Sequence, residues 1–333
     1  MADLRIWRGL DEIQGDFGPC ALTIGNFDGV HIGHQEILRR LVRLAGEHGW
    51  KSAAMTFDPH PAQVLAPERA PRLLSTLEQR CRWMAEAGLE QVLIVPFTPE
   101  FSSTSPEEFA ARVLAKQLDA RIVLVGENFR FGRGKGGDAE QLRQLGARYG
   151  FRTEIVGGVR FRRHPVSSSE VRRLLSEGRV TLACRLLGRP YSIAGEVVRG
   201  TGTGSRLTVP TLNLTPGEQL VPARGVYVSR TVEAEGGRHW PSVTNVGVRP
   251  TFGGTRLTVE SYLLAPLDGG PPRRIAVEFL HRLRPERRFP DAEALRRQIL
   301  HDAARAAAWH RRRERFRAKR PERPGGQRPT VWL

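Results

Sequence analysis

Apolar and polar positions follow two different periods along the first half of the chain. Short apolar runs, which predict buried strands, alternate with stretches in which apolar residues recur every three or four positions, which predict amphipathic helices. Strands are expected at 21–24, 51–57, 91–95, 122–125 and 153–156, and helices at about 37–45, 77–87, 105–118 and 138–149. This order predicts a parallel, doubly wound sheet, whose ligands bind beyond the carboxyl ends of the strands.

The pattern changes near residue 190. Short segments rich in Val, Thr and Tyr, separated by Gly and Pro, occupy 191–198, 208–214, 225–232, 242–248, 257–264 and 275–280, and a long helix is expected at 292–309. These segments predict a small antiparallel barrel. The expected fold class is therefore α/β plus β: a doubly wound domain over 1–187, a barrel domain with a C-terminal helix over 188–310, and a basic, disordered tail over 311–333.

Composition is that of a soluble globular protein. The chain has 333 residues, 40% hydrophobic and 26% charged, which is enough for two domains with their own cores. Its first residues lack the build of a signal peptide and no run is long enough to span a bilayer, so we expect a cytoplasmic protein. Cys20, Cys81 and Cys184 have no disulfide or zinc-ribbon spacing and are expected to be buried thiols.

The charge of the chain raises the question of a polyanionic partner. The formal net charge is +17, and much of the excess lies after residue 304, where arginines far outnumber acids. Few aromatic residues, Trp309 and Phe316 among them, interrupt these arginines as stacking platforms for bases. Nucleic acid is therefore not the expected partner. No membrane association is expected, and the sequence does not predict an oligomeric state.

One stretch, residues 25–34, carries the clearest chemistry. A strand-like run breaks there into a Gly-rich loop, and a helix follows. Glycines let a ligand approach the backbone closely, and the free N–H groups of a helix start attract anions, so the stretch predicts a phosphate site. His31 and His34 flank Gly33 at the helix start, where two imidazoles can donate to phosphate oxygens.

The residues alone leave two other interpretations of this stretch open. In one, His31 and His34 form a metal pair with Asp28, although no cysteine lies near them and the nearest other histidine is His48. In the other, the stretch is a structural Gly-rich turn without a ligand.

The order of residues in this stretch, Gly-Asn-Phe-Asp-Gly-Val-His-Ile-Gly-His, decides between them. It resembles the signature of the HxGH nucleotidyltransferases, and in this extended form that of the bacterial bifunctional riboflavin kinase/FMN adenylyltransferases, or FAD synthetases. The resemblance implies an FMN adenylyltransferase domain in which His31 and His34 are catalytic. It further implies that ATP is bound by Gly25, Asn26, Phe27, Asp28 and Gly33.

A second polar cluster opens a later helix at residues 166–172. Ser167, Ser169 and Arg172 can form a phosphate clamp, although a serine N-cap beside a surface arginine is the plainer interpretation. The same family carries a serine-rich motif ending in Ile/Val-Arg, so the resemblance implies that these three residues hold the ATP phosphates. It also implies that Asn128, which follows the strand at 122–125, lies near the nucleotide and flavin.

The barrel half has candidate chemistry of its own. The Gly-rich loop at 200–205 suits a phosphate, and equally a plain hairpin. Thr211 and Asn213 lie two residues apart, hence on one strand face, where hard oxygen ligands suit Mg²⁺. Glu260 is the one acid within 259–264, so it is either an exposed strand carboxylate or a placed base.

The Pro-Thr-Leu-Asn sequence at 210–213, with residues 245–252 and 259–262, resembles the flavokinases. The resemblance implies that Glu260 accepts the proton of the ribityl hydroxyl as that oxygen attacks the γ-phosphate of ATP. It implies phosphate binding by Gly202 and Gly204, Mg²⁺ binding by Thr211 and Asn213, and flavin or nucleotide contacts by Asn245 and Arg249. Residues 204–213 and 264–274 depart from the family pattern, which bears on the kinase and its flavin contacts.

The two motif sets predict a bifunctional enzyme. It would phosphorylate riboflavin to FMN with ATP and then adenylylate FMN to FAD with release of pyrophosphate, with Mg²⁺ as cofactor, ATP as co-substrate, and FMN and FAD as product ligands. One alternative is a nucleotidyltransferase for another phosphorylated acceptor with an impaired kinase domain. The other, from a different class, is a basic RNA-associated protein.

Overall fold

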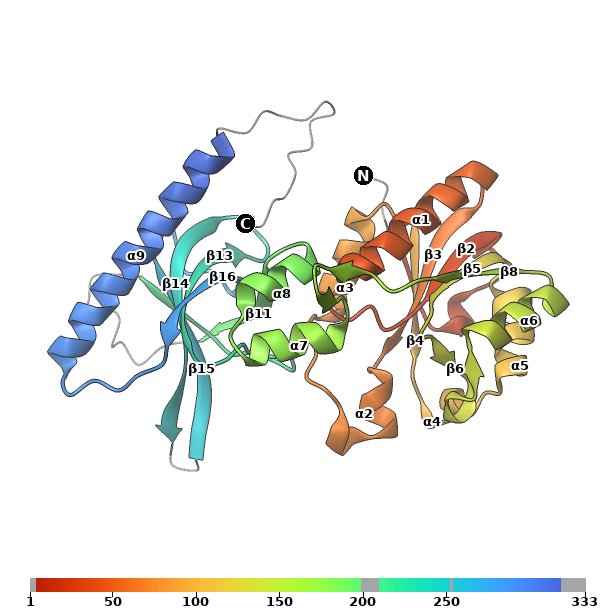
Figure 1. Ribbon diagram of the computed structural model, residues 1–333, viewed down its shortest axis with the longest axis horizontal. Helices are drawn as coiled ribbons and strands as arrows, with labels where there is room; N and C mark the ends of the chain where they lie inside the picture. Colours follow the sequence, from red (N-terminus) through yellow and green to blue (C-terminus); the bar gives the residue numbers. More distant parts are fainter. Residues whose placement is uncertain (1–3, 199–209, 252–253, 319–333) are drawn as a thin grey trace. The chain divides into compact units, whose positions relative to one another are not determined.

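The computed structural model describes residues 4–198, 210–251 and 254–318, and the chain divides into two compact units, Met1–Ser167 and Ser168–Leu333 (Figure 1). The predicted domain boundary after residue 187 stays a prediction.

The first unit is built on a six-stranded parallel sheet in the order β1-β4-β3-β2-β5-β8. Its strands are β1 (Arg5–Arg8), β2 (Cys20–Ile24), β3 (Lys51–Asp58), β4 (Gln91–Pro96), β5 (Ala120–Gly126) and β8 (Arg152–Val156). The predicted parallel sheet is confirmed, although the sequence analysis missed the short edge strand β1, which is too polar to stand out. The strand order reverses at β2, between β3 and β5, and ligands bind beyond the carboxyl ends of strands at such a point.

Helices cover both faces of this sheet. They are α1 (Ile32–His48), α2 (Pro61–Leu65), α3 (Leu77–Glu86), α4 (Pro99–Ser102), α5 (Pro106–Glu108), the π-helical η3 (Phe109–Gln117) and α6 (Ala139–Tyr149). Short 3-10 turns are η1 (Leu10–Glu12), η2 (Pro67–Arg69) and η4 (Arg133–Lys135), and two small ribbons pair β6 (Arg130–Phe131) with β7 (Gly137–Asp138) and β9 (Arg160–Phe161) with β10 (His164–Pro165). Ser105 caps α5 by accepting the N–H of Glu108 at 3.1 Å, as its position before Pro106 predicts.

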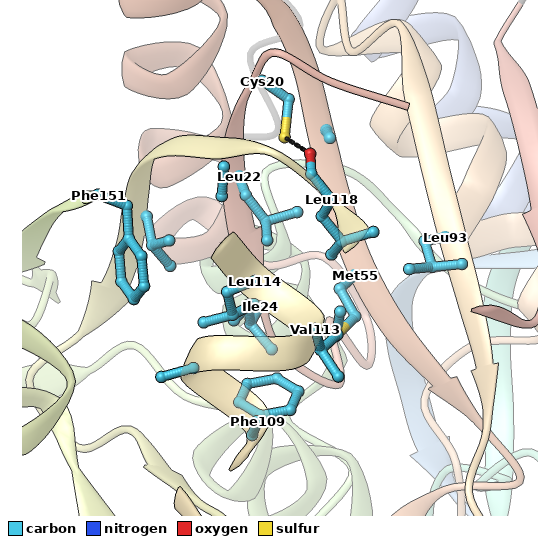
Figure 2. Packing of buried hydrophobic residues seen from close by; sticks show 14 of the residues in the cluster. Cys20, Leu22, Ile24, Met55, Leu93, Phe109, Val113, Leu114, Leu118 and Phe151 are labelled. Carbon is cyan, nitrogen blue, oxygen red and sulfur yellow. Dashed lines mark hydrogen bonds between the residues drawn. The ribbon is translucent and has the colours of Figure 1, made fainter. Parts of the chain in front are cut away.

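Alternate side chains of the central strands pack into two separate hydrophobic cores, one on each face of the sheet. Cys20, Leu22 and Ile24 of β2 point into the core shared with η3 and α6, which Figure 2 shows from close by. Ala21 points into the opposite core, beneath α1 and α3. The Cys20 thiol donates to the carbonyl oxygen of Leu118 at 3.4 Å, and burial raises the pKa of that thiol to about 12. The cysteines Cys20, Cys81 and Cys184 are free and buried, as predicted.

The second unit contains a closed antiparallel barrel in the order β11-β12-β15-β14-β13-β16. Its strands are β11 (Tyr191–Val198), β12 (Thr211–Leu214), β13 (Gly225–Glu233), β14 (His239–Thr251), β15 (Gly254–Leu263) and β16 (Arg274–Pro285). The helices in the described part of this unit are α7 (Ser168–Ser176), α8 (Val180–Leu187) and α9 (Ala292–Ala318). Helix α8 packs on β11 and β16, and α9 packs on β13 and β14. The predicted barrel and C-terminal helix are confirmed.

Hydroxyl groups fill one side of the barrel interior. Ser229 and Thr231 of β13, Ser242 and Thr244 of β14, and Ser261 of β15 are fully buried and hydrogen-bonded to one another at 2.6 to 3.2 Å. Apolar side chains fill the remainder. Because neighbouring residues of a strand point to opposite faces, these inward positions identify the intervening positions as outward.

Helix α9 is longer than predicted. It continues to Ala318, so residues 311–318, expected to begin a disordered tail, are helical. Ala306 is buried against the barrel and Trp309 packs beside it, and such tertiary packing stabilises a helix more than propensity does. The following residues are mainly arginine, whose helix propensity is good, so the helix propagates beyond its anchored part. The rest of the predicted tail lies outside the described residues.

Candidate active sites

The turn from β2 to α1 has an unusual backbone. Phe27 has φ of 48° and Val30 has φ of 36°, and the intervening Gly29 has φ of 80°. Left-handed φ is rare for a bulky residue and rarer still for a β-branched one, so this turn is strained. Phe27 and Val30 are both buried, and Val30 donates its N–H to the Phe27 carbonyl at 2.9 Å. The strained conformation is therefore fixed by packing and hydrogen bonding.

Asp28 ties this turn to the segment before α3. Its carboxylate accepts the N–H of Leu74 at 2.9 Å, and the N–H and the hydroxyl of Ser75 at 3.0 Å. The Ser75 hydroxyl also accepts the N–H of Gly29 at 2.8 Å. Asp28 is only 3% exposed, and these contacts turn its carboxylate inward. The predicted contact of Asp28 with phosphate stays a prediction, and its described contacts hold the loop.

His31 is the N-cap of α1. Its Nδ1 accepts the backbone N–H of His34 at 3.2 Å, so the ring proton lies on Nε2 and the imidazole is neutral. The His31 and His34 rings stack with their centroids 3.6 Å apart and an interplanar angle of 11°. Two charged imidazoliums at that distance would repel each other. The stacking therefore disfavours the state in which both rings are charged, and the Nε2–H of His31 can serve as a donor.

The first turn of α1 keeps two backbone donors open. Among the described residues, the N–H groups of Ile32 and Gly33 have no acceptor, as is usual for the start of a helix. At Gly33, a Cβ atom would lie 3.2 Å from Nδ1 of His31, so glycine permits the close approach of the capping ring. The helix start thus combines two free N–H groups with two imidazoles, a chemical fit for an anion.

A cavity of about 690 Å³ lies beyond the carboxyl ends of the strands. Gly25 and Asn26 of the turn line it, together with Asn128 after β5, so the structure brings these three predicted residues together. Much of the remaining wall is aromatic and is formed by Phe57, Phe97, Phe101, Phe109, Phe129 and Phe131. Polar side chains complete the wall, among them the basic residues Arg130, Arg133 and Lys135. A volume of this size is typical of a site for a small organic ligand.

The serine cluster lies at the change from one unit to the next. Ser167 closes the first unit, and Ser169 and Arg172 lie on α7 in the second. The helix predicted to open at 166–172 is confirmed as α7. Ser169 is exposed and Arg172 is half-buried. Their binding of ATP phosphates stays a prediction.

The barrel aligns its candidate residues across three strands. Asn213 of β12 pairs directly with Glu260 of β15, which pairs in turn with Asn245 of β14. Directly paired residues project from the same face of a sheet. Their neighbours Leu212 and Ser261 are buried inside, so this face is the outer one. Thr211 lies on the same outer face, opposite Tyr262.

Glu260 is a buried carboxylate on this outer face, 7% exposed. Its Oε2 accepts the hydroxyl of Tyr262 at 3.3 Å. An exposed strand carboxylate, the plainer interpretation of the sequence, is therefore wrong. Arg249 lies in β14, but its side chain is outside the described part, as are Gly202 and Gly204.

The residue set Thr211, Asn213 and Glu260 offers hydroxyl, amide and carboxylate oxygens. Mg²⁺ prefers hard oxygen ligands and is usually held by one or two protein groups together with substrate phosphates, so this outer face fits Mg²⁺. No cluster of three or more His, Cys, Asp or Glu side chains suited to a metal occurs in the described residues. The alternative of a metal centre at His31, His34 and Asp28 is therefore not supported.

The sequence analysis missed two features of the first site. One is the set of cavity phenylalanines: Phe57 lies near the end of β3, Phe97 directly follows β4 and Phe129 follows β5, a recurrence that the sequence shows. Arg80 was also missed: it lies on α3 at 2% exposure, and its hydrogen bonds run to Asn26 and to the end of β3. The sequence feature that could have identified Arg80 is its position: it is a charged residue beside Cys81, on the apolar face of a predicted helix.

Comparison with known proteins gives matches over both units. The FAD synthetase family matches residues 13–170, and the riboflavin kinase family matches residues 187–310. The bifunctional riboflavin kinase/FMN adenylyltransferase of Escherichia coli (strain K12) is 35% identical over 305 residues, covering 90% of this chain and 96% of the relative. The protein of the same description from Pseudomonas fluorescens is 39% identical over 306 residues, covering 92% and 97%.

A solved structure with a different description has a similar fold. The crystal structure of a macrolide-efflux protein from Streptococcus pneumoniae superposes with a TM-score of 0.82 at 26% identity, covering 92% of this chain and 100% of that one. Among the described residues, no helix has the length and apolar character needed to cross a membrane. The two family matches and the full-length relatives agree with each other, and the chain belongs to the bifunctional riboflavin kinase/FMN adenylyltransferase family.

Proposed function

We propose that the two units carry out successive ATP-dependent steps on a flavin, with FMN made on the outer face of the barrel and FAD made at the β2–α1 turn. The chain carries both enzyme domains of its family, which supports the conversion of riboflavin to FMN and of FMN to FAD. The observation that carries the placement of the second step is the turn itself. It borders an aromatic cavity at Gly25 and Asn26 and ends at the imidazole-capped start of α1.

In the adenylyl transfer, an oxygen of the FMN phosphate attacks the α-phosphorus of ATP, and the bond to the bridging oxygen breaks to release pyrophosphate. No side-chain nucleophile takes part, so the protein acts by positioning the reactants and stabilising charge. The N–H groups of Ile32 and Gly33 and the Nε2–H of His31 would donate to phosphate oxygens. The six phenylalanines of the cavity would hold the isoalloxazine ring by stacking and exclude water.

In the kinase step, the terminal ribityl hydroxyl attacks the γ-phosphorus of ATP and ADP leaves. Glu260 would take the proton of that hydroxyl, and Tyr262 would orient its carboxylate through the 3.3 Å hydrogen bond. Thr211 and Asn213 would hold Mg²⁺, which when bound neutralises charge on the ATP phosphates. Asn245 lies beside Glu260 on β14 and would contact flavin or nucleotide.

The site residues define the test. Purified protein is incubated with riboflavin, ATP and Mg²⁺, and the flavins are separated by chromatography. We expect FMN followed by FAD, and FAD alone when FMN is supplied. Absence of both products contradicts the proposal, and loss of both on removal of Mg²⁺ is expected. A cytoplasmic location is part of the proposal, because both steps consume ATP.

A further inference from the structure

Arg80 is a buried arginine close behind the β2–α1 turn. It lies on α3 and is 2% exposed. The start of α3 is fixed by a capping box between Thr76 and Gln79, and the segment just before it is held by Asp28. The position of the Arg80 side chain is therefore rigidly coupled to that of the turn.

The guanidinium of Arg80 joins two strand ends. Its Nη1 donates to the carbonyl oxygen of Asn26 at 3.1 Å, to the hydroxyl of Thr56 at 3.2 Å and to the carbonyl oxygen of Phe57 at 3.3 Å. The Thr56 hydroxyl itself lies 3.3 Å from the Asn26 carbonyl, to which it donates. Asn26 and Phe57 both line the cavity. One side chain thus fixes the loop after β2 against the end of β3.

The carboxylates of Asp28 and Asp58 both favour the charge of Arg80, but its one ion pair among the described residues is long. Its nearest described carboxylate, that of Asp58, lies 3.9 Å from Nη2 and is half exposed. The Nε atom has no hydrogen-bond partner among the described residues. Burial lowers the pKa of Arg80, and the carboxylates of Asp28 and Asp58 oppose that shift. A buried charge is costly even when carboxylates lie nearby, and an anion bound near the turn would reduce that cost further.

We propose that Arg80 is a positioning residue for adenylyl transfer, which orients the Asn26 carbonyl and the strained turn and holds a positive charge behind the loop that receives the ATP phosphates. This inference rests on the proposed function of the turn. It assigns Arg80 two separable contributions. The hydrogen bonds donated by Nη1 set the geometry of the turn, and the charge favours the bound polyphosphate.

Two substitutions separate these contributions. Arg80→Met keeps much of the side-chain volume but removes both the donors and the charge. Arg80→Lys keeps the charge on a single ammonium that does not reproduce the planar fork. Arg82→Met is the matched control, because Arg82 lies on the same helix with its side chain 60% exposed. His31→Ala reports whether the turn serves adenylyl transfer at all.

The measurements are kcat and KM for ATP in the conversion of FMN to FAD, inhibition by pyrophosphate, and the Tm of the full chain. For Arg80→Met we expect kcat/KM to fall about 100-fold, with weaker pyrophosphate inhibition, since a small misplacement of reacting groups costs that much. For Arg80→Lys we expect a lower kcat with KM for ATP near that of the wild type. Arg82→Met should match the wild type.

Several outcomes overturn the inference. One is wild-type FAD formation by Arg80→Met when His31→Ala has lost it. Another is equal weakening of ATP and pyrophosphate binding in Arg80→Lys and Arg80→Met, which would assign no role to the charge. If Arg80→Met does not fold, the KM and kcat of Arg80→Lys decide alone, and a wild-type kcat there contradicts the positioning role. Retained FAD formation in His31→Ala overturns the proposed site and this inference with it.

Discussion

The β2–α1 turn and the outer face of the barrel present different parts of the chain to the phosphates that we propose they bind. The turn offers backbone N–H groups at a helix start beside a stacked pair of imidazoles, and its residues are contiguous at 25–34. The barrel face offers side-chain oxygens from β12, β14 and β15, which only strand pairing brings together. The first site depends on loop conformation, and the second on strand register.

This difference also changes what a substitution does. In the turn, the residues that hold the loop, such as Asp28 and Arg80, are buried and bind the backbone. On the barrel face, the side chain of the proposed base Glu260 is also buried and accepts a hydrogen bond from Tyr262, but the pairing of its strand with β12 and β14 uses backbone groups only. Side-chain changes in the barrel should therefore alter chemistry with little effect on the fold, and changes under the turn should alter both.

The largest effect is expected at Glu260. Glu260→Gln removes the proposed base while preserving shape, and FMN formation should fall about 10²- to 10⁴-fold, the range for loss of a general base. FAD formation from supplied FMN should remain. The exposed Glu235 gives the control Glu235→Gln, which should leave both rates unchanged. Loss of both steps in Glu260→Gln would break the separation of the two sites.

His31→Ala tests the proposed role of the β2–α1 turn in FAD formation. Removal of the capping imidazole and its Nε2–H should lower FAD formation about 10²- to 10³-fold, as for loss of one donor to a transition-state oxyanion. FMN formation should continue at the wild-type rate. His48→Ala, at the exposed end of the same helix, is the control. FAD formation near the wild-type rate in His31→Ala would remove the turn from the proposed mechanism.

Asp28→Ala sharpens the assignment of Asp28 as a loop-holding residue. Loss of the Asp28 carboxylate leaves the buried N–H groups of Leu74 and Ser75 without their acceptor. This should lower the free energy of unfolding of the first unit by about 3 kcal/mol. Thermal and urea unfolding of the full chain measure this loss. A stable variant whose only defect is a higher KM for ATP would instead support the predicted phosphate contact.

The smallest expected effect is a pH dependence at α9. Burial lowers the pKa of His310, whose Nε2 lies 3.0 Å from the Ser229 carbonyl oxygen, and nearby Arg313 lowers it further. Below the unfolded pKa of about 6.5, the unfolded chain binds a proton that the folded chain does not. The contribution of neutral His310 to the free energy of unfolding is therefore complete above that pH and is lost as the pH falls.

The check is Tm between pH 8 and pH 5.5 in the wild type and in His310→Gln, with a difference on the order of a few degrees. His281, whose pKa is also lowered by burial, contributes with the same sign and remains in the variant. An identical acid-induced loss of Tm in both proteins would contradict a contribution from His310.

Much of the fold and part of each site were accessible from sequence because their signals are local. The run before Gly25 and the helical spacing after His34 predicted β2 and α1, and the Val- and Thr-rich segments predicted the barrel. The role of Asp28 was not accessible, because its partners Leu74 and Ser75 are distant in the chain. The alignment of Asn213, Glu260 and Asn245 likewise depends on strand order, which periodicity does not encode.

The pairing of Asn213 with Glu260 has a consequence for redesign of the barrel. β12 has four residues, and its polar Thr211 and Asn213 alternate with the buried Leu212 and Leu214. A slip of one residue against β15 would turn both leucines to the surface and both polar residues into the core. A barrel assembled out of register would therefore lose part of its core and the proposed metal ligands Thr211 and Asn213 together.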